Sequence, residues 1–161
     1  MDDVFLGLAV IVIAGIALMK NIQTTQNEID LTGLVESCAD SYGLDRNLVK
    51  AIVLKESSWD PNNENDADPS WGLMGVTQYI GERFGAISST DDPAAGLKIP
   101  EKNLQAGCGY LKYLLGLYPL EDSIEMYNEG EPNFWDGLRV PDYLAAVMEN
   151  YNGYQAATIS S

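Results

Sequence analysis

The chain contains no histidine, and its 161 residues include only two cysteines and nine basic side chains. Without histidine it cannot form a Ser-His-Asp triad, a histidine site for zinc or an imidazole switch near neutral pH. Any proton transfer must therefore depend on carboxylates or tyrosines. The sequence indicates no cofactor and no metal site.

The small numbers of basic residues and cysteines exclude further classes of protein. With 24 acidic residues the formal net charge is −15, which repels phosphate backbones, so nucleic acid is not expected as a partner. Cys38 and Cys108 lie too far apart for a metal knuckle and are too few for a disulfide framework. Since cysteine is often a small buried hydrophobe, we expect two buried thiols.

One long apolar run stands at the start of the chain, where residues 4–19 carry no charge between Asp3 and Lys20. As a helix this run spans about 24 Å, slightly less than a bilayer core. A secretory signal would have basic residues before the run and a small-residue cleavage site after it, and both are missing. We expect residues 1–20 to be a transmembrane anchor and residues 21–30 a polar linker.

From Leu31 onward the apolar spacing is that of a mainly α protein. Asp45 is a suitable N-cap for the second helix, and Pro141 suits the first turn of the last one. No convincing alternating strand is found, and residues 60–71 and 88–100 are expected to be loops. We expect one helical domain over 31–152 and a C-terminal tail over 153–161, with helices over 31–42, 45–58, 73–84, 104–118, 122–127 and from 141.

Glu56 is the most informative residue of the second predicted helix. At 100° per residue it lies at the centre of the apolar stripe formed by Leu48, Val49, Ile52 and Val53. Burial disfavours the charged form, so this carboxyl should have a raised pKa and can donate a proton near neutral pH. The alternative is a structural glutamate satisfied by a buried arginine or by backbone donors.

Four segments together resemble the lytic transglycosylases of the lysozyme-like superfamily. The first contains Glu56 followed by Ser57, and the last has the order Tyr-Asn before a glycine. Each motif alone is weak, but their order and spacing are those of the family. Tyr143 and Tyr151 occupy the place of its closing tyrosine pattern, and the segments are 51–61 (AIVLKESSWDP), 69–74 (PSWGLM), 103–111 (NLQAGCGYL) and 126–130 (MYNEG).

The resemblance implies a lysozyme-like helical fold and cleavage of the β-1,4 bond between N-acetylmuramic acid and N-acetylglucosamine in peptidoglycan. Glu56 matches the residue that acts first as acid and then as base, while the muramyl C6 hydroxyl attacks C1 to leave a 1,6-anhydro end. By the same resemblance Tyr127 holds substrate or tunes Glu56, and Ser70, Met74 and Asn128 line the saccharide groove.

One position departs from the family pattern. Gly75 stands where the family has a glutamine after Leu-Met, so an amide expected to contact the sugar is missing. Gln78 lies three residues later, almost one helical turn, and we hypothesise that its side chain reaches the same space.

The favoured interpretation is a membrane-anchored peptidoglycan lytic transglycosylase at a virion membrane or a bacterial inner membrane. It would open the cell wall locally for an infecting phage or serve a secretion system, with glycan strands, the membrane at residues 4–19 and other proteins of the virion or secretion complex as partners. One alternative is a goose-type lysozyme-like hydrolase, in which Asp66 or Asp68 positions a water. Another is a structural or glycan-binding protein with a degenerate fold.

Overall fold

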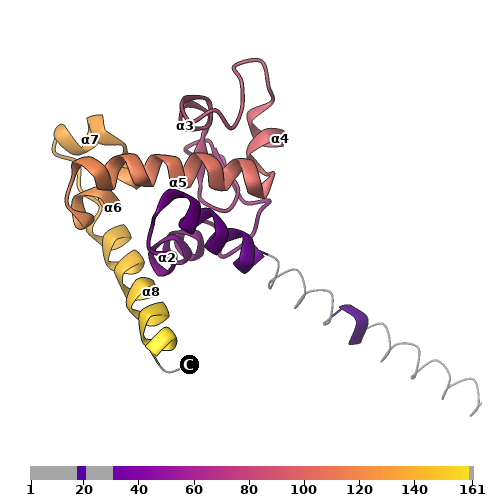
Figure 1. The fold of residues 1–161 in the computed structure, drawn as a ribbon. Coiled ribbons are helices and arrows are strands. Elements are labelled where there is room, and N and C mark those ends of the chain that lie inside the picture. The colour runs from indigo at the N-terminus through magenta and orange to yellow at the C-terminus, as the bar shows by residue number, and fades with distance from the viewer. Residues whose placement is uncertain (1–17, 21–30, 160–161) are drawn as a thin grey trace, which may run out of the picture. The chain divides into compact units, whose positions relative to one another are not determined.

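The computed structural model describes residues 18–20 and 31–159 of the chain (Figure 1). The chain divides into two units, Met1–Gly33 and Leu34–Ser161, and the account below concerns the second. The expected linker over 21–30 and all but residues 18–20 of the expected anchor lie outside the described residues. Within the described ranges, no helix combines the length and the apolar character needed to cross a bilayer.

Helices make up most of the described chain, which confirms the expectation of a mainly α protein. Residues 31–42 form the first helical segment. Figure 1 shows α5 running across the domain, and α3, α4 and α6 all pack against it. The later helices are α2 (Arg46–Ser57), α3 (Gln78–Arg83), α4 (Pro93–Leu97), α5 (Pro100–Leu117), α6 (Leu120–Glu129), α7 (Glu131–Trp135) and α8 (Pro141–Ile159).

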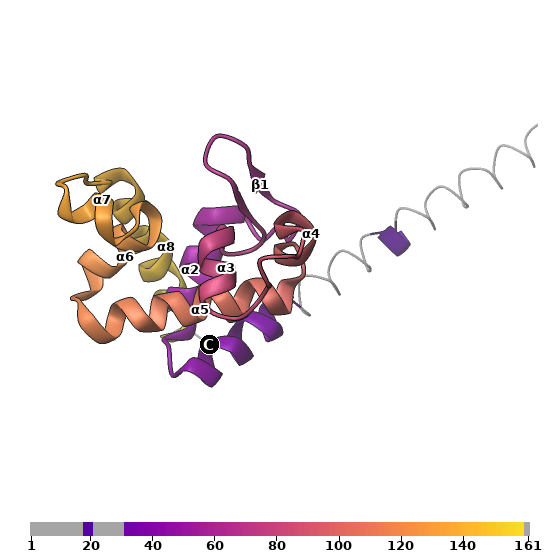
Figure 2. The same cartoon turned by 90° about the horizontal axis from the view of Figure 1, so that it is seen from above.

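Helix α2 begins as its sequence predicts. Oδ1 of Asp45 accepts hydrogen bonds from the backbone amides of Asn47 and Leu48, at 2.7 and 3.3 Å. These two amides would otherwise have no partner at the helix start, so the cap fixes where the helix begins. The helix then packs along α8, and Figure 2 shows the two side by side. This pairing brings an early helix of the domain against its last one.

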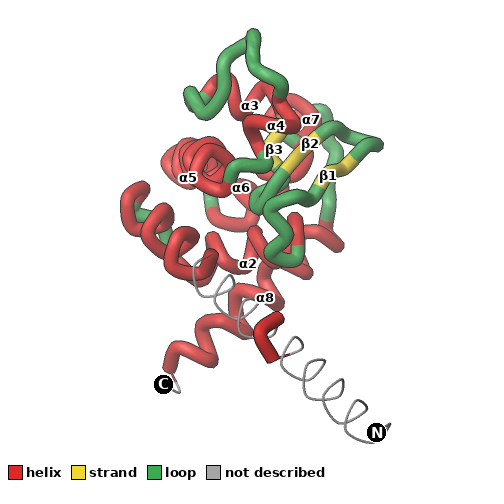
Figure 3. Tube along the Cα trace, turned by 90° about the vertical axis from the view of Figure 1, so that its right-hand side faces the viewer, coloured by secondary structure: helices red, strands yellow, loops and turns green. Residues whose placement is uncertain are grey.

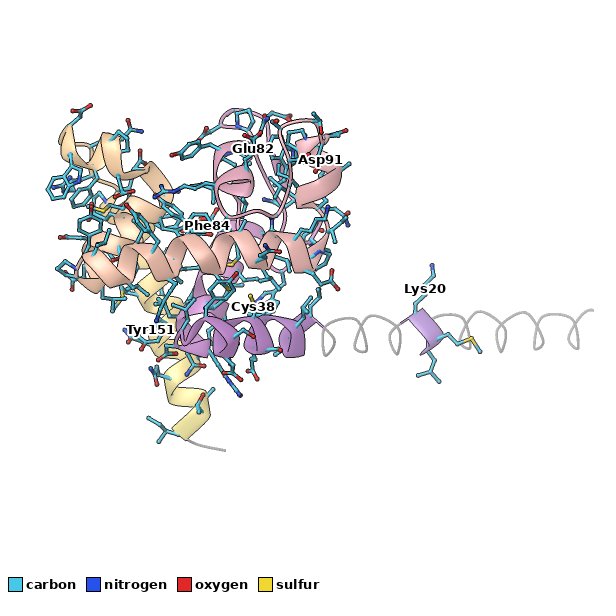
Figure 4. All side chains as sticks on the ribbon, turned by 45° about the horizontal axis from the view of Figure 1, so that its top comes forward. Lys20, Cys38, Glu82, Phe84, Asp91 and Tyr151 are labelled. Carbon is cyan, nitrogen blue, oxygen red and sulfur yellow. The ribbon has the colours of Figure 1, made fainter. Side chains whose placement is uncertain are left out.

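Helix α5 carries the central part of the core on the face predicted from its spacing, with Leu104, Cys108, Leu111 and Leu114 all buried. The two cysteines are free thiols, as expected, but only Cys108 is fully buried and Cys38 is half-buried. Figure 4 shows Cys38 on the helical segment over 31–42, toward α5.

A small antiparallel sheet was missed by the sequence analysis. Strands β1 (Glu64–Asn65), β2 (Ser70–Trp71) and β3 (Val76–Thr77) lie in that order, as Figure 3 shows. Trp71 pairs with Glu64 on one side and with Val76 on the other. Strands of two residues are too short to show alternation, so the predicted loop over 60–71 is in part a sheet.

The helix predicted over 73–84 is wrong in its first half. Helix α3 begins only at Gln78, where the hydroxyl of Thr77 accepts from the amide of Ile80 at 3.4 Å. The preceding segment turns at Gly75, whose φ of +58° is incompatible with a helix, and then enters β3. The apolar residues of this segment belong to a turn and a strand. They are buried at intervals that happen to match the spacing of a helix.

Four other helices differ from those predicted. Helix α4 lies within the expected loop over 88–100 and is capped by Asp92, with Pro93 in its first turn. Helix α6 starts at Leu120 and ends at Glu129, two residues beyond the predicted range at each end. Helix α7 was not expected. Helix α8 starts at Pro141 as predicted, but it continues to Ile159, so most of the expected tail is helical.

Candidate active site

The carboxyl group of Glu56 lies at the wall of a cavity of about 80 Å³. The residue occupies the last turn of α2, and its side chain is half-buried. Burial is the largest influence on this group and raises the pKa of Glu56 from 4.5 to about 7, against smaller lowering effects of the Tyr143 hydroxyl and the Lys55 charge. Glu56 therefore keeps its proton up to about pH 7 and can act there as a general acid.

Tyr143 from α8 holds one oxygen of this carboxyl group. Its hydroxyl donates to Oε1 of Glu56 at 2.5 Å, and the tyrosine side chain is almost fully buried. Burial and the nearby charge of Glu56 raise the pKa of Tyr143 well above its ordinary value, so this hydroxyl stays protonated. It is a permanent donor to Glu56.

The cavity at Glu56 continues into a larger one of about 640 Å³. The two share lining residues from the β1–β2 turn, from β3 and α3, and from α5 and α6, so they form one groove with Glu56 at one end. Two exposed aromatic side chains, Tyr79 and Trp135, line its far part. The shared lining residues are Asp68, Thr77, Ile80, Tyr110, Tyr127 and Asn128.

Three of the predicted groove residues, Ser70, Tyr127 and Asn128, line the same cavity as Glu56. The hydroxyl of Tyr127 donates to the backbone carbonyl of Met74 at 2.9 Å. Burial, and after it the charge of Glu56, raises the pKa of Tyr127 well above its ordinary value. Tyr127 therefore anchors the turn beside Glu56 and remains a neutral part of the cavity wall.

The structure does not bring Met74 and Gln78 to the site in the way the sequence suggested. The side chain of Met74 is completely buried, 3.9 Å from Sγ of Cys108. Gln78 is exposed and donates to Glu82 at 2.8 Å, and Figure 4 shows Glu82 on α3. Neither residue lines the groove. The expected relation between Gly75 and Gln78 assumed a helix that begins only at residue 78.

Asn103 of α5 fixes the turn beneath Glu56, a role that its motif did not reveal. Its Nδ2 donates to the carbonyls of Trp71 and Leu97, at 2.6 and 2.8 Å, and its Oδ1 accepts from the amide of Met74 at 2.8 Å. Ser57 adds a hydrogen bond to the carbonyl of Leu73 at 2.9 Å. Because Asn103 is fully buried, its bonds replace water for backbone groups of the turn and of the end of α4.

The backbone directly after Glu56 adopts an unusual conformation. Ser58 and Trp59 both have positive φ angles, 52° and 68°, which non-glycine residues seldom adopt. Asn63 supports this turn by donating to the carbonyl of Glu56 at 3.2 Å. Strain of this kind is concentrated at functional sites, where the surrounding structure holds it in place.

Among the side chains that the structure describes, no three acidic, cysteine or histidine residues converge on a position suited to a metal ion. Glu56, held by Tyr143, lies at the inner end of the groove, and Asp68 is the other carboxylate that lines the 80 Å³ cavity. The arrangement can deliver a proton to a bound molecule from one partly buried carboxyl group.

Comparison with known proteins supplies the family. Residues 33–145 match the family described as the transglycosylase SLT domain. The chain belongs to this family. The family that the four motifs indicated is thus confirmed, and Glu56 lies within the matched range.

Named relatives of this SLT domain are "Membrane-bound lytic murein transglycosylase C" proteins. The protein from Sodalis glossinidius is 33% identical over 105 residues, which are 60% of this chain and 29% of the relative. The protein from Yersinia enterocolitica is 34% identical over 88 residues, 53% of this chain and 24% of the relative. The chain thus spans less than a third of the length of these relatives.

Proposed function

We propose that this SLT domain cleaves the β-1,4 bond between N-acetylmuramic acid and N-acetylglucosamine in peptidoglycan. The observation that carries the proposal is the partly buried carboxyl group of Glu56, with a pKa of about 7, at the inner end of a groove. The relatives are named lytic murein transglycosylases, which supports the same substrate.

The proposed reaction uses Glu56 twice. The protonated carboxyl group gives its proton to the glycosidic oxygen, the C1–O bond breaks, and the N-acetylglucosamine side leaves with a new hydroxyl. The carboxylate then accepts the proton of the muramyl C6 hydroxyl as that oxygen bonds to C1, which closes a 1,6-anhydro ring. No water is consumed and Glu56 is protonated again, so a single carboxyl group is sufficient.

The surrounding residues support this double role. Tyr143 orients the carboxyl group and stabilises its charged form between the two steps, since its hydroxyl donates to Oε1. Ser70 and Asn128 offer polar groups to the sugar in the same cavity. The rigid turn held by Asn103 and Tyr127 keeps the site in place without substrate.

We further propose that residues 1–20 anchor the domain in a virion membrane or a bacterial inner membrane. The support is the uncharged run over 4–19 and the membrane-bound description of the relatives. Such an anchor suits an enzyme that opens the wall locally during phage infection or beside a secretion complex, and other proteins of that virion or complex would then be partners.

A hydrolytic outcome is the second candidate, because Asp68 lines the cavity that contains Glu56. In a hydrolase, the carboxylate of Asp68 would activate a water, and this water would attack C1 in place of the C6 hydroxyl. Asp66, the other residue considered for that role, does not line the cavity. The hydrolase therefore depends on Asp68 alone.

The test is to incubate the full-length chain, in mild detergent, with purified peptidoglycan and to measure the masses of the soluble products by mass spectrometry. Anhydro ends, one water lighter than hydrated ends, support the transglycosylase. If the parent chain instead produces hydrated reducing ends, and Glu56→Gln produces none, the protein is a hydrolase and not a transglycosylase. Wall binding without any product from the folded parent chain would overturn both reactions.

A further inference from the structure

Gly75 lies directly against the carboxyl group of Glu56. A Cβ atom added to Gly75 would lie 2.3 Å from Oε2 of Glu56 and 3.0 Å from its Cδ. Real Cβ atoms essentially never come so close to another heavy atom. The space that a side chain at position 75 would need is therefore occupied by the carboxyl group.

The backbone of this turn has little freedom to withdraw from Glu56. The amide of Met74 bonds to Asn103, and the carbonyl of Met74 accepts from the hydroxyl of Tyr127. Gly75 itself donates to the carbonyl of Gly72 at 3.3 Å. A side chain at position 75 would thus have to displace the carboxyl group, since the end of a glutamate moves more easily than a buried turn.

The other oxygen of the carboxyl group is held from the opposite element of the fold. Oε1 accepts from Tyr143 of α8, while Oε2 lies over the bare Cα of Gly75. The carboxyl group therefore sits between a hydroxyl group and a stretch of backbone. The carboxyl group can occupy this position between Tyr143 and Gly75 only while residue 75 has no side chain.

We propose that Gly75 is a positioning residue, whose missing side chain lets the carboxyl group of Glu56 lie at the cavity wall in contact with Tyr143. The glycine that replaces the family's glutamine then helps to position the carboxyl group of Glu56. That this position of the carboxyl group serves catalysis rests on the proposed function, whereas the position itself can be tested without substrate.

The first test compares Gly75→Ala with Gly85→Ala. Both glycines have a positive φ, +58° and +69°, so both substitutions strain the backbone, but a Cβ at Gly85 meets nothing closer than 3.9 Å. The carboxyl carbon of Glu56 is followed by NMR over pH, with its signal assigned by its loss in Glu56→Gln. Gly75→Ala should lower the pKa of Glu56, because the carboxyl group moves into the open cavity and the loss of burial, the largest influence on this group, outweighs the loss of the Tyr143 hydrogen bond.

Gly85→Ala should leave the pKa of Glu56 unchanged. A folded Gly75→Ala variant in which Glu56 titrates as in the parent, or at higher pH, would overturn the proposal. Neither outcome depends on activity, so a failure of the proposed function is seen separately in the peptidoglycan digest.

The second test is a double-mutant cycle on stability, which remains informative when Gly75→Ala folds poorly. Glu56→Ala removes the Oε2, Cδ and Cγ atoms that a Cβ at position 75 would meet. In that background Gly75→Ala should lower the urea midpoint no more than Gly85→Ala does, whereas in the parent it should lower it further. An equal loss from Gly75→Ala in both backgrounds would show that Glu56 is not the obstacle, which contradicts the proposal.

Discussion

The hydroxyl of Tyr143 donates a hydrogen bond of 2.5 Å to Glu56, although the two residues are 87 positions apart in the sequence. The bond joins the end of α2 to the beginning of α8, two helices that pack along each other. The position of the acid therefore depends on the C-terminal helix of the domain. This link makes the titration of Glu56 sensitive to a residue outside the four motifs.

Tyr143→Phe removes the donor and keeps the ring. Because this hydrogen bond lowers the pKa of Glu56, its loss should raise that pKa further and move the alkaline limb of the activity profile to higher pH. Tyr151→Phe is the matched control. Tyr151 also lies on α8, but its hydroxyl donates to Asp45 and not to Glu56. An alkaline limb that stays in place or moves to lower pH in Tyr143→Phe would contradict the assigned role.

The pKa of Glu56 also predicts how the stability of the domain depends on pH. The folded value, about 7, lies above the ordinary 4.5, so the protonated form is favoured by folding. This contribution is fully present below pH 4.5 and is lost as the pH rises through 7, an effect of at most about 3 kcal/mol for a side chain partly open to the cavity.

Glu56→Gln removes that dependence. Relative to the parent chain, the variant should gain free energy of unfolding as the pH rises from 4 to 8, measured by urea unfolding at both values. The same difference between variant and parent at the two pH values would show that Glu56 carries no desolvation cost in the fold.

Asn103 should be important for stability as well as for the site. Replacing it with alanine removes three buried hydrogen bonds, to the carbonyls of Trp71 and Leu97 and to the amide of Met74, which should cost about 2 to 4 kcal/mol. Gln105→Ala is the control on the same helix, because its amide makes one exposed bond, to Phe84. Equal urea midpoints for the two variants would contradict this account of the turn.

Asp68→Asn separates the two outcomes considered for the cleavage. If the C6 hydroxyl is the nucleophile, anhydro ends should persist and the rate should change by less than about tenfold, since Asp68 takes no proton. Asp66→Asn serves as the control outside the cavity. A loss of about a hundredfold in Asp68→Asn alone, with hydrated ends in the parent, would favour the hydrolase.

The parts of the fold that the sequence predicted are those set by neighbours along the chain. The Asp45 cap and the apolar face of α5 follow from spacing within one or two turns, as does the inward position of Glu56 on α2. The raised pKa of Glu56 followed in turn, because burial alone dominates it.

The missed features depend on contacts between distant segments. The sheet consists of strands too short to show a pattern, and the bond from Tyr143 to Glu56 forms only when α8 packs on α2. Gly75 could be noticed as a departure, but its contact with Glu56 required the turn's positive φ to be known. A false helical spacing over 73–84 also placed Gln78 near the site.

The most direct measurement of the central claim is the rate at which soluble fragments are released from peptidoglycan by Glu56→Gln and by Glu82→Gln. Both changes replace a carboxyl group with an amide, but Glu82 lies on α3 outside the groove. The account predicts a loss of at least about a hundredfold for Glu56→Gln and parental activity for Glu82→Gln. Release by a folded Glu56→Gln variant at more than about a tenth of the parental rate would contradict Glu56 as the acid.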